Sequence, residues 1–189
     1  MVIMVGAFAG LRSGECLGLR WGDVDLQERQ IHVRQQLQHK KPKPLKSDSS
    51  QRIVPISDRL TLELKKWRLR CPIGEMDLVF PNAEGGPANT SDVNNRALRS
   101  VIRSCAFERP ELGRFTYHNL RHTFASVALT HARLPLLEVS KLLGHASMVV
   151  TARVYAHFVQ DRLDEIQRAL SGAHSDSATV PATRRIDVG

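Results

Sequence analysis

The first eleven residues, MVIMVGAFAGL, are apolar or glycine throughout, and this run constrains the fold more than any other part of the sequence. It is too short to span a bilayer, and it lacks the charged leader and cleavage region of a secretory signal. A helix that is apolar on every side has to be covered by the rest of the protein. The run therefore predicts a buried helix over residues 2–20 of a soluble, intracellular protein.

Length and composition are typical of one globular domain with a tail. The chain has 189 residues, of which 42% are hydrophobic, enough for a substantial core. A formal net charge of +8 favours a polyanionic partner, with nucleic acid ahead of an anionic membrane. Cys16, Cys71 and Cys105 are widely spaced and form no Cys-x-x-Cys pair. They indicate buried thiols in a reducing compartment, and neither a disulfide frame nor a zinc site.

Two short segments predict an antiparallel sheet. Residues 30–37, QIHVRQQL, have a two-residue period that indicates a strand. Residues 52–56 predict a second strand, which we expect at the sheet edge because Pro55 has no N–H to donate. The intervening residues 38–51 are rich in lysine, proline and serine, and they predict a turn or a mobile hairpin tip.

The other elements are predicted to be helices that begin next to capping residues. They cover residues 58–70 after Ser57, 92–107 after Ser91, 117–132 after Thr116, and 136–143 between Pro135 and Gly144. A last helix is expected over about residues 155–170, followed by a disordered tail over 171–189. The predicted fold class is mainly α with a small antiparallel β-sheet (α+β), in a single domain of residues 1–170.

Arg12 and Glu15 are three residues apart and would share one helical face. Such a pair is commonly a surface ion pair that stabilises a protein little. The apolar residues before Arg12 favour a guanidinium that is at least partly buried, and a buried arginine usually holds a carboxylate or a phosphate in its planar fork. The spacing leaves both interpretations open.

The segment YHNLRHTF places His118, Arg121 and His122 on one face of a helix. The two histidines could share a zinc ion, but no third ligand is evident and Arg121 would repel a cation, so we expect no metal. A solvated basic face is a second interpretation. The third is an anion site, because histidine and arginine both donate hydrogen bonds to phosphate oxygens.

Lys46 belongs to a basic run that also contains Lys40, Lys41 and Lys43. Most lysines in such a run contact solvent or a nucleic-acid backbone. One lysine on a mobile turn could instead enter a site as a general acid. The spacing does not distinguish among the four.

His145 and Tyr155 lie ten residues apart in the segment LLGHASMVVTARVYAHF. His145 follows a predicted helix end, where a partly charged imidazole would stabilise the helix dipole. Core packing is the default role of Tyr155, and a nucleophilic hydroxyl is the alternative. Neither residue can be assigned a role from its own position. The order of all these segments along the chain is more informative.

Taken in order, the segments resemble the tyrosine recombinase, or phage integrase, family. GLRSGECLGLRWGDVDL is similar to the first signature of the family, LKSDSSQRIVPI to its β-hairpin segment, HNLRHTFAS to its His-x-x-Arg box, and LLGHASMVVTARVYAH to its last box. The likeness spans about residues 2–160 and implies the fold of the family's catalytic domain. Family members usually carry a further helix and a DNA-clamping domain before this region. We therefore expect the 189 residues alone to bind DNA weakly and not to recombine it.

The resemblance also implies an active site. Its catalytic residues would be Arg12, Lys46, His118, Arg121, His145 and Tyr155, with Glu15 orienting the first arginine. The two arginines and His145 would donate to the non-bridging phosphate oxygens, and Lys46 would protonate the leaving 5′ oxygen. His118 would take or position the proton of the nucleophile, Tyr155. No cofactor is expected, because these side chains can replace Mg²⁺.

The function implied by the resemblance is site-specific breakage and rejoining of DNA through a 3′-phosphotyrosyl intermediate. Its partners would be double-stranded DNA and copies of the chain in a tetramer, without a membrane or a small-molecule substrate, in the cytoplasm at the nucleoid. Contacts to the DNA backbone are expected from Lys40, Lys41, Lys43, Arg96 and Arg99. Two alternatives are a non-catalytic DNA-binding remnant and a type IB topoisomerase-like strand transferase. The spacing of His145 and Tyr155 and the sequence LLGH favour the integrase over the topoisomerase-like enzyme.

Overall fold

The apolar N-terminal run forms two short helices, α1 (Val2–Ala9) and α2 (Ser13–Leu17), where the sequence predicts one helix. Gly10 ends α1 in the left-handed region, with a φ of 65°. A Cβ on Gly10 would lie 2.4 Å from the ring of Phe124. Glycine adopts this conformation without steric cost, and Arg12 then takes an extended conformation before α2. The prediction of a continuous helix over residues 2–20 is therefore wrong.

The computed structural model of the chain describes residues 1–45, 47, 50–105, 115–147, 149 and 151–152, without the side chains of residues 94–96 and 105. Residues Met1–Thr151 form one compact unit. Lys46, Tyr155, the predicted last helix and the predicted tail lie outside the described residues. In the part that is described, no helix has the length and apolar character needed to cross a membrane.

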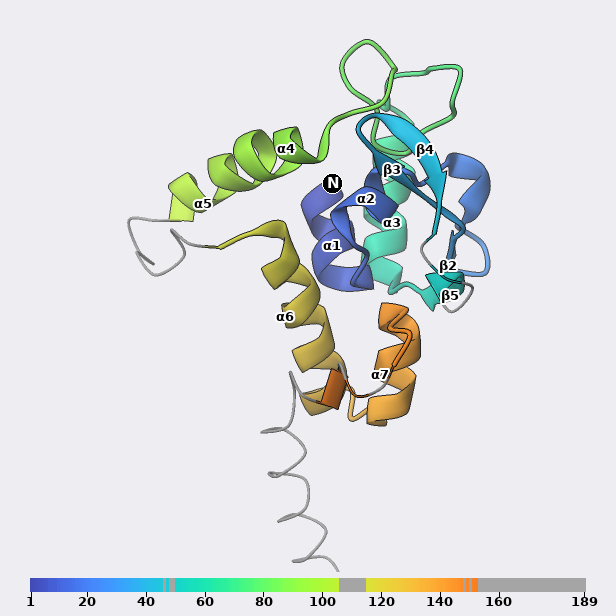
Figure 1. The fold of residues 1–189 in the computed structure, drawn as a ribbon. Coiled ribbons are helices and arrows are strands. Elements are labelled where there is room, and N and C mark those ends of the chain that lie inside the picture. Colours follow the sequence, from blue (N-terminus) through green and yellow to red (C-terminus); the bar gives the residue numbers. More distant parts are fainter. Residues whose placement is uncertain (46, 48–49, 106–114, 148, 150, 153–189) are drawn as a thin grey trace, which may run out of the picture. The chain divides into compact units, whose positions relative to one another are not determined.

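Helix α1 is a core helix, as predicted. It contacts α6 (Tyr117–Thr130), α3 (Asp58–Arg68) and α2 (Figure 1). Gly6 allows α6 to approach closely, because a Cβ there would lie 2.7 Å from the hydroxyl oxygen of Tyr117. That hydroxyl donates to the Val2 carbonyl at 3.3 Å. Tyr117 is therefore fixed in the core, with 3% of its surface exposed.

The strands form two antiparallel sheets instead of one. The larger sheet has the order β1-β2-β5, and the smaller one is a hairpin of β3 and β4. Their bounds are β1 Val24–Asp25, β2 Gln30–Val33, β3 Gln35–Gln38, β4 Lys41–Pro44 and β5 Arg52–Pro55. The predicted strand over residues 30–37 is thus divided at Arg34, and part of the predicted turn is strand β4. Strand β5 is an edge strand, as Pro55 predicts.

The turn of the β3–β4 hairpin explains why a strand forms within the basic segment. His39 and Lys40 both have positive φ, 51° and 62°. Positive φ at both central residues is the mark of a type I′ turn, whose twist matches that of the flanking strands. Neither residue is glycine or asparagine, so the sequence carries little sign of this turn.

Alternate residues of β2 and β5 face the core. Ile31 lies opposite Val54, and Val33 lies opposite Arg52. The three aliphatic residues are at most 2% exposed. Because side chains alternate across a strand, Arg52 occupies an inward position in line with Val54 despite its charge. This position directs the arginine toward α7 (Leu136–Leu143), which β5 contacts.

Of the four helices predicted between residues 58 and 143, three begin where expected. The Ser57 hydroxyl accepts a hydrogen bond from the Leu60 N–H at 3.3 Å and caps α3. Helix α6 follows Thr116, and α7 lies between Pro135 and Gly144. The exception is α4 (Thr90–Asp92), which is capped by Asn89 and not by the predicted Ser91. It continues as the π-helical segment η3 (Val93–Leu98) and α5 (Arg99–Cys105); η1 (Trp21–Asp23) is a short 3₁₀ turn.

Candidate active site

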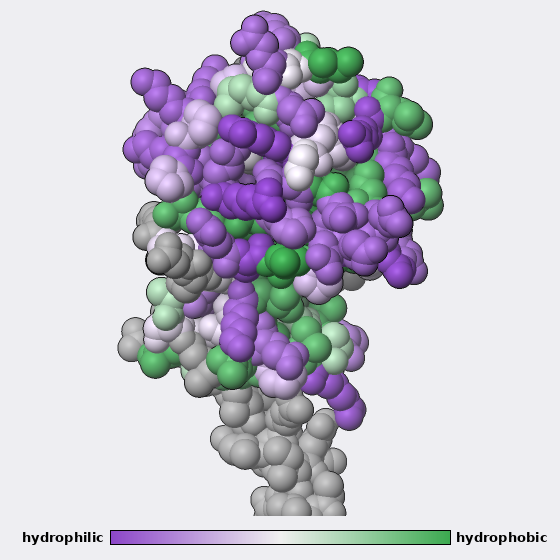
Figure 2. Space-filling view, turned by 90° about the vertical axis from the view of Figure 1, so that its right-hand side faces the viewer, coloured by the Kyte–Doolittle hydropathy of each residue, from purple (hydrophilic) through white to green (hydrophobic). Residues whose placement is uncertain are grey.

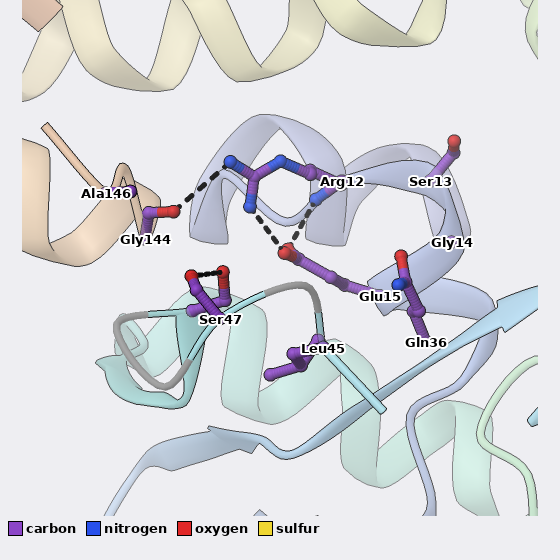
Figure 3. Close-up of a pocket in the computed structure, with 10 residues that line it drawn as sticks. Arg12, Ser13, Gly14, Glu15, Gln36, Leu45, Ser47, Gly144 and Ala146 are labelled. Carbon is purple, nitrogen blue, oxygen red and sulfur yellow. Dashed lines mark hydrogen bonds and ion pairs between the residues drawn. The ribbon is translucent and has the colours of Figure 1, made fainter. Parts of the chain in front are cut away.

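A cavity of about 400 Å³ opens between α2, the β3–β4 hairpin and the loop after α7 (Figure 3). Its lining residues are Arg12, Ser13, Gly14, Glu15, Gln36, Leu45, Ser47, Ser50, Gly144 and Ala146. The first four come from the start of α2, and the last two follow α7. Leu45 and Ser47 are the chain neighbours of Lys46, so the two residues that flank the predicted general acid line this cavity.

Arg12 and Glu15 form a pair at the start of α2. Glu15 Oε2 accepts from the Arg12 backbone N–H at 2.9 Å, and Oε1 accepts from Arg12 Nη1 at 2.7 Å. Glu15 is 2% exposed, whereas 39% of the Arg12 side chain is exposed. The alternative of a surface ion pair is therefore wrong, and the predicted partly buried guanidinium is confirmed. Arg12 is the N-cap of α2 and not part of a long helix, so the pairing joins the cap to the third helical residue.

A second arginine, Arg52, approaches Glu15 from strand β5. Its Nη2 donates to Oε2 at 2.8 Å and its Nη1 to Oε1 at 3.3 Å. Burial by itself raises the pKa of Glu15, but the hydrogen bonds and charges of Arg52 and Arg12 outweigh it and hold this pKa at about 2. The carboxylate is therefore ionised at neutral pH. Arg52 was not among the predicted site residues, although a charged residue at an inward strand position was a signal that could have revealed it.

Arg121 is deeply buried, with 2% exposure. Its Nη1 donates to the Gly10 carbonyl at 2.8 Å, and its Nη2 donates to the Leu143 carbonyl. Nη1 also lies 4.0 Å from Glu15 Oε2. Both carbonyls lie at the C-terminal end of a helix that is terminated by a glycine in the left-handed conformation. These glycines are Gly10 after α1 and Gly144 after α7. The alternative interpretation of a solvated basic face is therefore wrong for Arg121.

His145 lies immediately after the end of α7. Its backbone N–H donates to the Ser140 carbonyl at 3.1 Å, and its Nδ1 is 2.7 Å from the hydroxyl of the buried Thr151. Burial lowers the pKa of His145 to about 4, helped by the charges of Arg121, Arg12 and Arg52. The imidazole is thus neutral at pH 7, and the expectation of a partly charged ring at the helix dipole is wrong.

His118 lies on the exposed side of α6, and its ring meets that of His122 edge-on, with centroids 4.5 Å apart. Desolvation lowers the pKa of His118, as do the charges of His122, Arg121 and Arg12. His118 is therefore within electrostatic reach of the two arginines, whose charges favour its neutral form. Across the residues that the structure describes, no three histidine, cysteine, aspartate or glutamate side chains are grouped so that they could hold a metal ion.

Two predicted catalytic residues, Lys46 and Tyr155, lie outside the described residues. The other tyrosine of the chain, Tyr117, lies among the described residues and is buried. Burial raises the pKa of Tyr117 well above its usual value, and its hydroxyl is engaged with Val2 in the core. The Tyr117 hydroxyl is therefore held in the core, and the role of Tyr155 as nucleophile stays a prediction.

The residues predicted to contact DNA lie on the β3–β4 hairpin and on the helical segments η3 and α5. Lys40, Lys41 and Lys43 are exposed on the β3–β4 hairpin, on a side of the molecule where hydrophilic side chains predominate (Figure 2). Lys43 pairs with Gln36, which lines the cavity. Directly opposed residues share a face of the hairpin, so Lys43 lies on the cavity side. Arg99 is exposed at the start of α5, and Arg96 belongs to η3, with a side chain that is not described.

Comparison with known proteins identifies the class to which this fold and site belong. A model of the phage integrase family matches residues 1–162. The chain therefore belongs to the phage integrase family. It is 33% identical over 162 residues to tyrosine recombinase XerC of Xylella fastidiosa (strain 9a5c), which covers 85% of this chain and 49% of the relative. The chain thus spans about half the length of the curated relatives that it matches.

Solved structures agree with this assignment. The crystal structure of XerA recombinase is 28% identical, with a TM-score of 0.65 over 85% of this chain and 55% of that one. The Tn1549 transposon integrase in complex with transposon right end DNA is 24% identical, with a TM-score of 0.73 over 88% of this chain and 57% of that one. This second likeness concerns the fold alone. The predicted α+β fold of a tyrosine recombinase catalytic domain is confirmed.

Proposed function

We propose that this chain carries the catalytic centre of a site-specific DNA recombinase that breaks and rejoins strands through a phosphotyrosine bond. The observation that carries the proposal is the convergence of Arg12, Arg121 and the His145 loop beside one cavity. Three guanidinium groups, including that of Arg52, share the single carboxylate of Glu15. The cluster therefore keeps an excess of positive charge, as stabilisation of a phosphorane-like transition state requires.

Each group has a distinct task in this proposal. Arg12, half-exposed at the cavity, grips the non-bridging oxygens of the scissile phosphate, because its fork matches phosphate geometry. Arg121 is buried and does not line the cavity, and its positive charge stabilises the same phosphate oxygens electrostatically. His145 takes the tautomer in which Nδ1 accepts from the Thr151 hydroxyl, 2.7 Å away, so that the Nε2–H of the neutral ring donates to the phosphate.

The nucleophile and the acid complete the reaction. Tyr155 attacks the phosphorus and forms the 3′-phosphotyrosyl bond, and His118, whose lowered pKa favours the neutral ring, accepts or positions the phenolic proton. Lys46 donates a proton to the leaving 5′ oxygen. Its chain neighbours Leu45 and Ser47 line the cavity, which supports this assignment. The same atoms in reverse rejoin the strand, so no external energy source is needed.

The substrate in this proposal is double-stranded DNA. The net charge of +8 and the exposed lysines Lys40, Lys41 and Lys43 support sequence-independent contacts with the phosphate backbone, to which Arg96 and Arg99 also contribute. The Tn1549 transposon integrase, whose fold this chain shares, has been solved in complex with circular intermediate DNA and with transposon right end DNA. We infer that recombination is carried out by a tetramer of the whole protein on DNA, in the cytoplasm at the nucleoid.

Covalent trapping tests the proposal. The chain is incubated in excess with a nicked suicide duplex, from which the cleaved end diffuses away, and SDS-resistant protein–DNA adducts are counted. The wild type should form an adduct and Tyr155→Phe should not. Binding without an adduct, at high protein concentration and low salt, would identify a non-catalytic DNA-binding remnant. Relaxation of supercoiled DNA regardless of its sequence would identify a topoisomerase-like strand transferase.

A further inference from the structure

The last three backbone carbonyls before His145 are each held by a different arginine. Arg52 Nε donates to the Leu142 carbonyl at 2.6 Å, Arg121 to the Leu143 carbonyl, and Arg12 Nη2 to the Gly144 carbonyl at 3.2 Å. Carbonyls at a helix C-terminus have no partners within the helix and carry its negative dipole. The three guanidinium groups therefore supply both hydrogen bonds and compensating charge at the end of α7.

Arg52, unlike Arg12, does not line the cavity. Its side chain is 6% exposed. Besides Leu142 and Glu15, it donates to the Ser50 carbonyl at 3.0 Å. It thus links the segment that follows Lys46, the carboxylate that supports Arg12, and the end of α7. A side chain with these partners does not touch substrate, but it controls groups that do.

The charge balance at Glu15 gives Arg52 a specific task. Both oxygens of Glu15 accept from Arg52, and both also accept from Arg12. Without Arg52, the full charge of the carboxylate would act on Arg12 and Arg121, drawing both toward Glu15 and away from a phosphate. A guanidinium is needed here, because a lysine ammonium cannot reach two carboxylate oxygens and the Leu142 carbonyl with a planar fork.

The backbone turn at Gly144 leaves room for the Arg52 guanidinium. Gly144 has a φ of 62°, and a Cβ on it would lie 2.8 Å from Arg52 Nη1. The guanidinium therefore packs directly against the turn that leads into His145. A shift of this group would move the turn, the Gly144 carbonyl that holds Arg12, and the imidazole together.

We propose that Arg52 is a positioning residue for the strand cleavage proposed above: by binding Glu15, Leu142 and Ser50 at once, it fixes Arg12 and His145 at the cavity. This inference rests on the proposed function. Displacing catalytic groups by about 1 Å can cost on the order of 10²-fold in rate. We therefore expect Arg52→Lys to slow cleavage by about that factor while DNA affinity stays unchanged.

Single-turnover cleavage of the suicide duplex and its binding constant are measured for the wild type, Arg52→Lys and Arg52→Ala. The matched control is Arg34→Lys, since Arg34 is 61% exposed and pairs with Asp23 away from the cavity. Millimolar guanidinium ion should partly restore cleavage by Arg52→Ala, because it can enter beside Glu15, and it should not affect Arg34→Lys. A merely structural role predicts neither a rate loss at unchanged affinity nor this rescue.

The two proposals fail in different ways. If the wild type forms no adduct at Tyr155, the proposed function is wrong. If the wild type cleaves and Arg52→Lys cleaves at a similar rate, or loses affinity in proportion to rate, the positioning role is overturned. If the variants unfold, hydrogen exchange at arginine Nε is measured in the wild type instead. The Nε–H of Arg52 should exchange far more slowly than the Nε–H of Arg34. Equal exchange rates would overturn the inference.

Discussion

Replacing Glu15 by glutamine removes the carboxylate on which Arg12 and Arg52 converge and leaves their guanidinium groups facing a neutral amide. Glu15 is 2% exposed and Arg52 is 6% exposed, so solvent compensates little. Removing one partner of a buried ion pair typically destabilises a protein by about 3–5 kcal/mol. The pKa of Glu15 gives a similar magnitude: a fall from 4.5 to about 2 corresponds to about 3 kcal/mol of stability at neutral pH.

The pH dependence of this loss follows from the sign of the shift. A carboxylate whose pKa is lower in the folded state stabilises the fold fully above its unfolded pKa, here 4.5, and loses that contribution as the pH falls toward 2. About 2 kcal/mol of the advantage over Glu15→Gln should vanish between pH 7 and pH 3. The difference between the two proteins should therefore shrink steadily in acid.

Urea unfolding followed by circular dichroism measures this at several pH values. Glu63→Gln is the matched control, because Glu63 pairs with Lys66 on the outer part of α3 and 57% of the Lys66 side chain is exposed. The control should unfold close to the wild type throughout. A Glu15→Gln protein as stable as the wild type near pH 7, or a difference that is constant down to pH 3, would refute the reasoning.

Three further predictions concern the site. Arg12→Lys and Arg121→Lys should each lower the cleavage rate on the order of 10²–10³-fold, because a point charge cannot replace a planar fork; near wild-type cleavage by either variant would contradict its role. EDTA should leave cleavage nearly unchanged, whereas a loss that Mg²⁺ restores would show that a metal takes part. Gly144→Ala should cost at least about 1–2 kcal/mol in urea unfolding, because φ is 62°. Gly22→Ala, with nothing within 4 Å of the added Cβ, should cost less; equal losses would contradict this account.

Local signals predicted much of the fold. Ser57, Thr116, Pro135 and Gly144 mark helix ends through the chemistry of caps and left-handed turns, which depends on a few neighbouring residues. The break at Gly10 was missed because the apolar run continues across it, and the closely packed Phe124 is more than a hundred residues away in the sequence.

The features of the candidate site also divide into those that neighbouring residues predict and those that depend on the fold. The pairing of Arg12 with Glu15 is local and was foreseen, although its geometry is that of a helix cap. Arg52 was missed because its partners, Glu15 and Leu142, come from α2 and α7, and no sequence period connects them. The neutral state of His145 was also missed, since it depends on burial and on three arginines that only the fold assembles.

The central claim is that Tyr155 forms the covalent bond with DNA, and mapping the adduct tests it most directly. Protein trapped on the suicide duplex is digested with trypsin and nuclease, and the modified peptide is sequenced by mass spectrometry. The account predicts a nucleotide joined through its 3′ phosphate to Tyr155. Attachment at Tyr117, whose hydroxyl is held by Val2 in the core, or at any other residue, or through a 5′ phosphate, would contradict it.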